Sequence, residues 1–135
     1  MTLIHWDNSF SVNVAEIDRQ HERLVAMINE LNDAMLQGKA KEVLGPLINR
    51  LFHYAETHFK TEETYFQRFG YPDAESHKRE HADFVAKVRD FKGQFDKNLL
   101  GLSVEMLIFL SDWWRRHIKV VDKQYGPFFN AHGLK

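Results

Sequence analysis

Histidine and carboxylate residues recur along this 135-residue chain at spacings that suit metal ligation. His58 and Glu62 lie four residues apart, and so do His77 and His81, so each pair projects from one face of a helix. Imidazole nitrogens and carboxylate oxygens are ligands that proteins offer to divalent metals. Together with three single residues, these pairs give seven candidate metal ligands: His21, His58, Glu62, His77, His81, His117 and Asp122.

The conjunction of these residues is more informative than any one of them. A lone histidine such as His21 is more often hydrogen-bonded to a backbone carbonyl than bound to a metal, and one i,i+4 pair arises readily by chance. Here, however, the polar residues fall in register with Leu, Ile, Phe and Met on the apolar stripes of four helices. So many unpaired ionisable groups in one small core would prevent folding, whereas a shared metal centre removes that cost.

The spacing of His117 and Asp122 predicts a distortion of the last helix. Five residues correspond to about 140° around an ideal α-helix, so a regular helix would not point both side chains at one site. We therefore expect a wide turn or a π-bulge between them, a feature found frequently at functional sites.

Five further residues are expected to face solvent or to lie in the terminal segments: His5, His53, His132, Glu63 and Glu80. His53 lies about 180° from the inward stripe of its helix. The two glutamates are each one residue off their stripes, so they are predicted to be solvated.

The seven candidate ligands can nearly complete the coordination of two six-coordinate ions. Five imidazoles, two bridging carboxylates and one bridging hydroxide leave a single open position, on one ion only, which suits the binding of one small molecule. Imidazole is compatible with zinc, copper, iron and nickel. Six-coordinate ions bridged by carboxylates argue against zinc, which prefers four ligands.

Four stretches with helical periodicity must position these ligands. The expected helices span about 18–37, 41–69, 74–95 and 103–121. No segment of strand length alternates with a period of two. The sequence therefore predicts an all-α fold, an up-down-up-down four-helix bundle, with an N-terminal arm over 1–17 packed by Trp6 and Phe10 and a short C-terminal segment. The whole chain, 1–135, is expected to form one domain.

Composition excludes several classes of protein. The chain has 18 Lys and Arg against 19 Asp and Glu, which leaves no basic footprint for nucleic acid. It has no apolar run of roughly 18 residues for membrane insertion and no secretory signal, so a cytoplasmic protein is expected. The absence of Cys excludes disulfides, thiolate iron–sulfur clusters, Cys-based zinc sites and a Cys nucleophile.

The ligand pattern closely resembles that of the hemerythrin family, in its single-domain bacterial form, the bacteriohemerythrins. All seven ligand positions match in type, order and spacing, and the resemblance covers nearly the whole chain. It implies a four-helix bundle that binds dioxygen reversibly at a non-haem di-iron centre, for oxygen storage, transport or delivery, and that is not an enzyme. By position, one iron would be held by His77, His81 and His117, the other by His21 and His58, and both would be bridged by Glu62, Asp122 and an oxo or hydroxo group. The open position would be on the iron held by His21 and His58.

Apolar residues beside the ligands would form a dry oxygen pocket: Leu24, Phe59, Trp113 and Ile118. Tyr125 is a candidate hydrogen-bond donor to a ligating carboxylate. Trp114 occupies a position where family members commonly have Leu, so we expect it to narrow the pocket or the path of oxygen.

Three alternatives stay open at the level of sequence. A di-iron oxidase or peroxidase is disfavoured because catalytic bundles of that kind use carboxylate-rich sites. An oxygen or redox sensor would need a separate protein partner, which is unknown, because the bundle uses the whole sequence. Iron storage is disfavoured by a site that protein ligands almost fill.

Overall fold

The computed structural model describes residues 3–97 and 101–135, so residues 1 and 2 of the predicted arm lie outside the described residues. Four long helices carry the fold: α1 (Ala15–Leu36), α2 (Ala40–Phe69), α3 (Ala74–Asp96) and α4 (Leu102–Trp113). A π-helix (Trp114–Val121) continues α4 and is followed by a 3-10 turn (Asp122–Gln124) and α5 (Tyr125–Ala131). A 3-10 turn (Asn8–Phe10) lies within the N-terminal arm.

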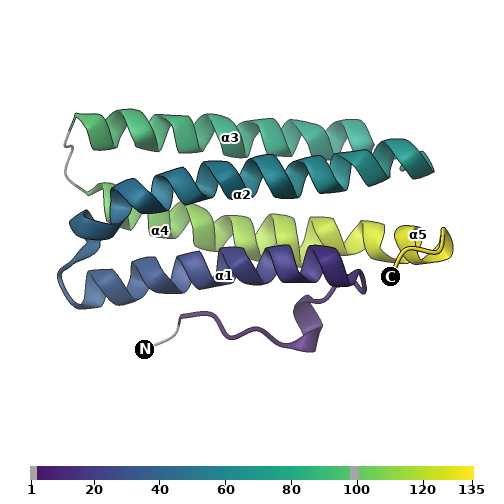
Figure 1. Ribbon diagram of the computed structural model, residues 1–135, viewed down its shortest axis with the longest axis horizontal. Helices are drawn as coiled ribbons and strands as arrows, with labels where there is room; N and C mark the ends of the chain where they lie inside the picture. Colours follow the sequence, from purple (N-terminus) through teal and green to yellow (C-terminus); the bar gives the residue numbers. More distant parts are fainter. Residues whose placement is uncertain (1–2, 98–100) are drawn as a thin grey trace.

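The four long helices lie side by side and alternate in direction (Figure 1). Each packs against the next in the chain, and α1 also packs against α4. No strand occurs among the described residues, and none of their helices is long and apolar enough to cross a membrane. The predicted up-down-up-down four-helix bundle is confirmed.

The first helix begins earlier than predicted. It starts at Ala15 instead of residue 18, so the arm ends at residue 14. Glu16 and Asp18 lie in the first turn, where negative charge interacts favourably with the helix dipole. The Asp18 carboxylate also accepts a hydrogen bond from the Val12 backbone N–H at 2.9 Å, which ties the arm to the start of the helix.

The buried apolar residues form two clusters, one on each side of the layer that contains the seven candidate ligands. On α1, Leu24 belongs to the larger cluster and Ile17 to the smaller one, with His21 between them. The same order recurs on α2 and near the C-terminus, where Ile118 and Tyr125 lie on either side of Asp122. Apolar packing on both sides therefore holds every element that carries a ligand.

The arm and α5 close one end of the molecule by a tight backbone approach. A Cβ atom added at Gly126 would lie 2.6 Å from the Val12 carbonyl oxygen, closer than real contacts of this kind. Glycine is therefore required for α5 to pack this closely against the arm.

Candidate metal centre

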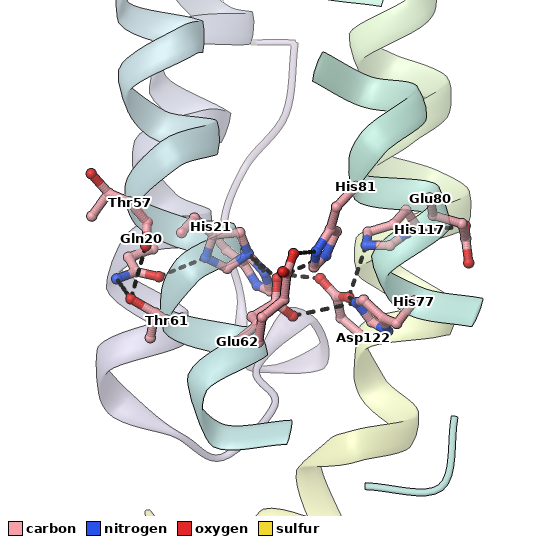
Figure 2. A network of polar contacts seen from close by, with 12 residues as sticks. Gln20, His21, Thr57, Thr61, Glu62, His77, Glu80, His81, His117 and Asp122 are labelled. Carbon is pink, nitrogen blue, oxygen red and sulfur yellow. Dashed lines mark hydrogen bonds and ion pairs between the residues drawn. The ribbon is translucent and has the colours of Figure 1, made fainter. Parts of the chain in front are cut away.

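The seven predicted ligands come together in the interior of the bundle. All are buried, with relative exposures between 0% and 2%. Glu62 lies between His21 on one side and His77 and His117 on the other (Figure 2). The ligand atoms fall into two groups, within each of which they lie no more than 4.8 Å apart: His77, His81 and His117 in one, and His21, His58, Glu62 and Asp122 in the other.

The carboxylates of Glu62 and Asp122 connect the two groups. Glu62 Oε1 lies 2.7 Å from His58 Nε2 and 3.5 Å from His81 Nε2. Asp122 Oδ2 lies 3.1 Å from His21 Nε2, and its Oδ1 lies 2.7 Å from His77 Nε2. Each carboxylate therefore reaches histidines of both groups, as a bridging ligand must.

The last helix brings Asp122 into this layer through a π-helix over Trp114–Val121. The Asp122 backbone N–H donates to the carbonyl oxygen of His117, five residues earlier, which is the hydrogen bond that defines a π turn. The wide turn predicted from the spacing of these residues is confirmed.

Several of the converging atoms have no hydrogen-bond partner. They are Nε2 of His77, His81 and His117 and both carboxylate oxygens of Glu62 and Asp122. These nitrogen and oxygen atoms lie close to one another because they all face a common centre. They do not form hydrogen bonds with one another. Leaving buried polar atoms unpaired costs about 1–3 kcal/mol each, so they require a compensating ligand. Neutral imidazole nitrogens and ionised carboxylates fit divalent metal ions well.

The electrostatics of the layer favour bound positive charge. Burial raises the pKa of Asp122, and so does the neighbouring Glu62, but the facing His117 and His21 outweigh both and hold that pKa far below its usual range. Burial lowers the pKa of His77, yet Asp122 and Glu62 raise it to about 10. The carboxylates therefore stay ionised inside the core and need cationic partners.

Outer nitrogens of two histidines are hydrogen-bonded to glutamates beside the layer. His81 Nδ1 donates to Glu63 Oε2 at 2.8 Å, and His117 Nδ1 donates to Glu80 Oε1 at 3.1 Å. The prediction that these glutamates are merely solvated is wrong, because each reaches a histidine on the neighbouring helix. His5, His53 and His132 are exposed, as predicted.

Aromatic and aliphatic side chains enclose the imidazoles. Phe59 stacks on His81 with ring centroids 3.8 Å apart, and Trp113 stacks on His117 at 3.9 Å. Leu24 and Ile118 are fully buried. These four residues, predicted to form a dry wall, thus pack in the interior beside the layer.

A sequence model described as the Hemerythrin HHE cation binding domain matches residues 12–129. The chain belongs to the hemerythrin family. A bacteriohemerythrin of Methylococcus capsulatus is 36% identical over 132 residues, which cover 97% of this chain and 100% of that protein. A hemerythrin-like protein of Naegleria gruberi is 31% identical and covers 90% of this chain and 89% of its own. A crystal structure of wild-type hemerythrin superposes with a TM-score of 0.78 at 34% identity, covering 93% of this chain and 96% of that one.

Trp114 lies between the N-terminal arm and His21. It is 2% exposed and its ring lies 6.4 Å from that of His21, nearly perpendicular to it. Trp6 and Phe10 of the arm contact it with centroid distances of 6.0 and 5.0 Å, so the predicted packing of the arm by these residues is confirmed.

Two tyrosines place buried hydroxyl groups near the centre. Tyr125 is fully buried, and burial, Asp122 and Glu62 raise the pKa of its hydroxyl well above the usual value. A hydrogen bond to the Glu62 carboxylate is among the causes of that shift, and donation by Tyr125 to a ligating carboxylate stays a prediction. Tyr54, which sequence reasoning missed, stacks on His58 at 5.1 Å and also has an unpaired hydroxyl. Its position four residues before His58 was the available signal.

Proposed function

We propose that this hemerythrin binds dioxygen reversibly at a non-haem di-iron centre, for oxygen storage, transport or delivery to oxygen-consuming enzymes. The observation that supports this most strongly is the convergence of five imidazoles and two carboxylates on one buried layer, where the inward nitrogens of three histidines and all four carboxylate oxygens lack hydrogen-bond partners. A domain that can bury a core of this size needs no metal merely to fold, so a metal here serves chemistry.

The two groups of ligands suggest how the ions are held. His77, His81 and His117 would hold one iron, and His21 and His58 would hold the other. Glu62 and Asp122 would bridge the two, because each already reaches histidines of both groups. If an oxo or hydroxo group also bridged the ions, the iron held by two histidines would be the one left with an open position. When bound, the di-iron pair supplies one electron from each ion for reversible binding of a single dioxygen.

The residues around the centre exclude water and reductants from it. Phe59 and Trp113 cover the rings of His81 and His117, while Leu24 and Ile118 fill the space between helices without any polar atom in their side chains. A dry surrounding protects ferrous ions from side reactions that would make oxygen binding irreversible. Trp114 adds a further cover beside His21.

The composition of the donor set favours a binding protein over an enzyme. Five of the seven candidate ligands are histidines, which would bind a metal as neutral imidazoles, whereas di-iron catalytic bundles are carboxylate-rich. Fewer anionic ligands stabilise highly oxidised iron less, so the centre is better suited to reversible binding than to oxidation of a substrate. We propose that one domain, spanning the chain, carries this function.

An absorption spectrum of the protein through one oxygen cycle tests the proposal. The anaerobically reduced protein is measured before oxygen, after oxygen and after purging with inert gas. We expect a ligand-to-iron band that appears with oxygen and disappears on purging, over several cycles. Conversion to a stable oxidised form that purging does not reverse would contradict a carrier and favour redox chemistry.

A further inference from the structure

The outward nitrogens of the histidines distinguish the two sides of the centre. On the three-histidine side (His77, His81 and His117), two of the outer nitrogens donate to carboxylates, at 2.8 Å from His81 to Glu63 and 3.1 Å from His117 to Glu80. Both glutamates come from a neighbouring helix and are about one-third exposed, at 34% and 33%. Each glutamate therefore contacts both a buried imidazole and water.

On the two-histidine side (His21 and His58), the outer nitrogens meet no negative charge. His58 Nδ1 donates to the amide oxygen of Gln20 at 2.6 Å. The Gln20 amide nitrogen donates to Thr61 Oγ1 at 3.2 Å, and the Thr61 hydroxyl donates to the Thr57 carbonyl at 2.9 Å. This chain of donors fixes the amide with its oxygen toward His58. Figure 2 shows Gln20 beside Thr57 and Thr61. Nδ1 of His21 is buried without a partner.

The two kinds of acceptor have different electronic effects on the imidazole. An acceptor at Nδ1 holds the proton there and leaves the Nε2 lone pair facing the centre. A carboxylate forms a charge-assisted hydrogen bond and raises the basicity of the ring as a ligand, whereas a neutral amide oxygen orients the ring with less effect on its basicity.

We propose that Glu63 and Glu80 are positioning residues that make the three-histidine side the tighter metal site, and that Gln20 keeps the two-histidine side weaker. This inference rests on the proposed di-iron centre. On this proposal, the histidines with carboxylate acceptors would hold the fully coordinated ion. The histidines without a charged acceptor would hold the ion with the open position. The side chains of Glu63, Glu80 and Gln20 lie outside the ligands themselves and would add to the difference that three histidines on one side and two on the other already make.

Three substitutions separate charge from orientation. Glu63→Gln and Glu80→Gln remove the charge but leave an oxygen able to accept the histidine proton. Gln20→Glu adds a charge on the other side. Glu56→Gln is the matched control, because Glu56 is exposed and lies two turns before Glu63 on the same helix. Binding of ferrous iron is measured anaerobically in competition with a chromogenic chelator.

We expect the wild type to bind two ions in two steps of different affinity. Glu63→Gln and Glu80→Gln should each weaken the tighter step by about 10- to 100-fold, the range typical of lost outer partners of metal ligands. Gln20→Glu should strengthen the weaker step, and Glu56→Gln should change neither. If Glu63→Gln shifts binding no more than Glu56→Gln, or Gln20→Glu weakens it, the inference is wrong.

Nitrogen-15 shifts of the histidine rings in the metal-free protein give a second readout. We expect His58, His81 and His117 to carry their protons on Nδ1, and His81 to keep that tautomer in Glu63→Gln. A proton on Nε2 of His81 would overturn the role of Glu63. If the wild type binds fewer than two ions, the di-iron centre itself fails with the inference, whereas two ions without the expected variant effects refute the inference alone.

Discussion

His117 Nε2 and Asp122 Oδ1 lie 3.1 Å apart although five residues separate them in the chain. A regular α-helix would turn the second side chain about 140° away from the first. The π-helix over Trp114–Val121 removes this difference by widening the turn. A π-helix is a rare and less favourable backbone conformation, so its presence between two buried polar residues is explained by the need for both in one layer.

Replacement of Asp122 should lower the number of metal ions that the centre binds. Asp122→Asn keeps the shape of the side chain but removes a charge and one of the two carboxylate oxygens that bridge the histidine groups. We expect iron content to fall from about two ions per chain to about one or fewer, because ligand charge contributes directly to metal affinity. Metal analysis after gel filtration measures this.

Asp112→Asn is the matched control for that experiment. Asp112 is exposed on the same helical segment and pairs with Arg115 at 2.7 Å, so its loss should cost only a few tenths of a kcal/mol. A full iron complement in Asp122→Asn, equal to that of the control, would show that Asp122 is not a ligand.

Removal of metal should lower the stability of the protein without unfolding it. The apolar clusters on both sides of the layer remain, but the inward nitrogens and oxygens lose their partners. A ligand at a hundred times its Kd stabilises the folded state by about 2.7 kcal/mol, which corresponds to a rise in Tm of about 10 °C for a chain of this size. Thermal unfolding followed by circular dichroism, with and without a chelator, should show this difference. Identical Tm values would mean that no metal occupies the layer.

The periodicity of the sequence predicted the layer because helical geometry fixes the direction of each side chain about its own axis. The i,i+4 pairs His58–Glu62 and His77–His81 therefore point inward as expected, and the irregular spacing before Asp122 predicted the π turn. The direction of a side chain alone does not predict which residue on a neighbouring helix it can contact. Glu63 points away from the stripe of α2, yet its long side chain bends to His81 on α3, a contact that depends on the distance between helices.

The early start of α1 escaped prediction for a different reason. The predicted helix began at residue 18, although the buried Ile17 lies one turn before His21 and continues the inward stripe. The helical conformation of residues 15–17 depends on the Asp18 carboxylate, which binds the Val12 N–H of the arm, and on packing of the buried Ile17. Contacts with a segment outside the helix thus decide where the helix begins.

Replacement of Trp114 should open the oxygen path. Trp114→Leu removes the aromatic ring beside His21 and leaves space between the arm and the π-helix. We expect oxygen association, oxygen release and autoxidation each to accelerate several-fold, with a loss of stability of about 2 kcal/mol from the cavity. Stopped-flow mixing and slow spectral conversion in air measure the three rates. Unchanged rates would show that Trp114 does not limit access.

A larger side chain at Gly126 should separate α5 from the arm. In Gly126→Ala the new Cβ would lie 2.6 Å from the Val12 carbonyl, so the backbone must shift, at a cost of about 1–3 kcal/mol. Gly93→Ala is the control, because that glycine lies inside α3 with no atom within 4 Å of the new Cβ. The control should gain about 0.5–1 kcal/mol from helix propensity. Urea unfolding of both variants tests this, and equal stabilities would contradict the tight approach.

Anomalous diffraction at the iron edge, from crystals of the iron-loaded protein, would locate the metal ions directly. We expect two peaks inside the bundle, both in contact with Glu62 and Asp122. The ligands around the two peaks should divide as the structure groups the histidines: His77, His81 and His117 at one, and His21 and His58 at the other. A single peak, or peaks outside this layer, would contradict the di-iron centre.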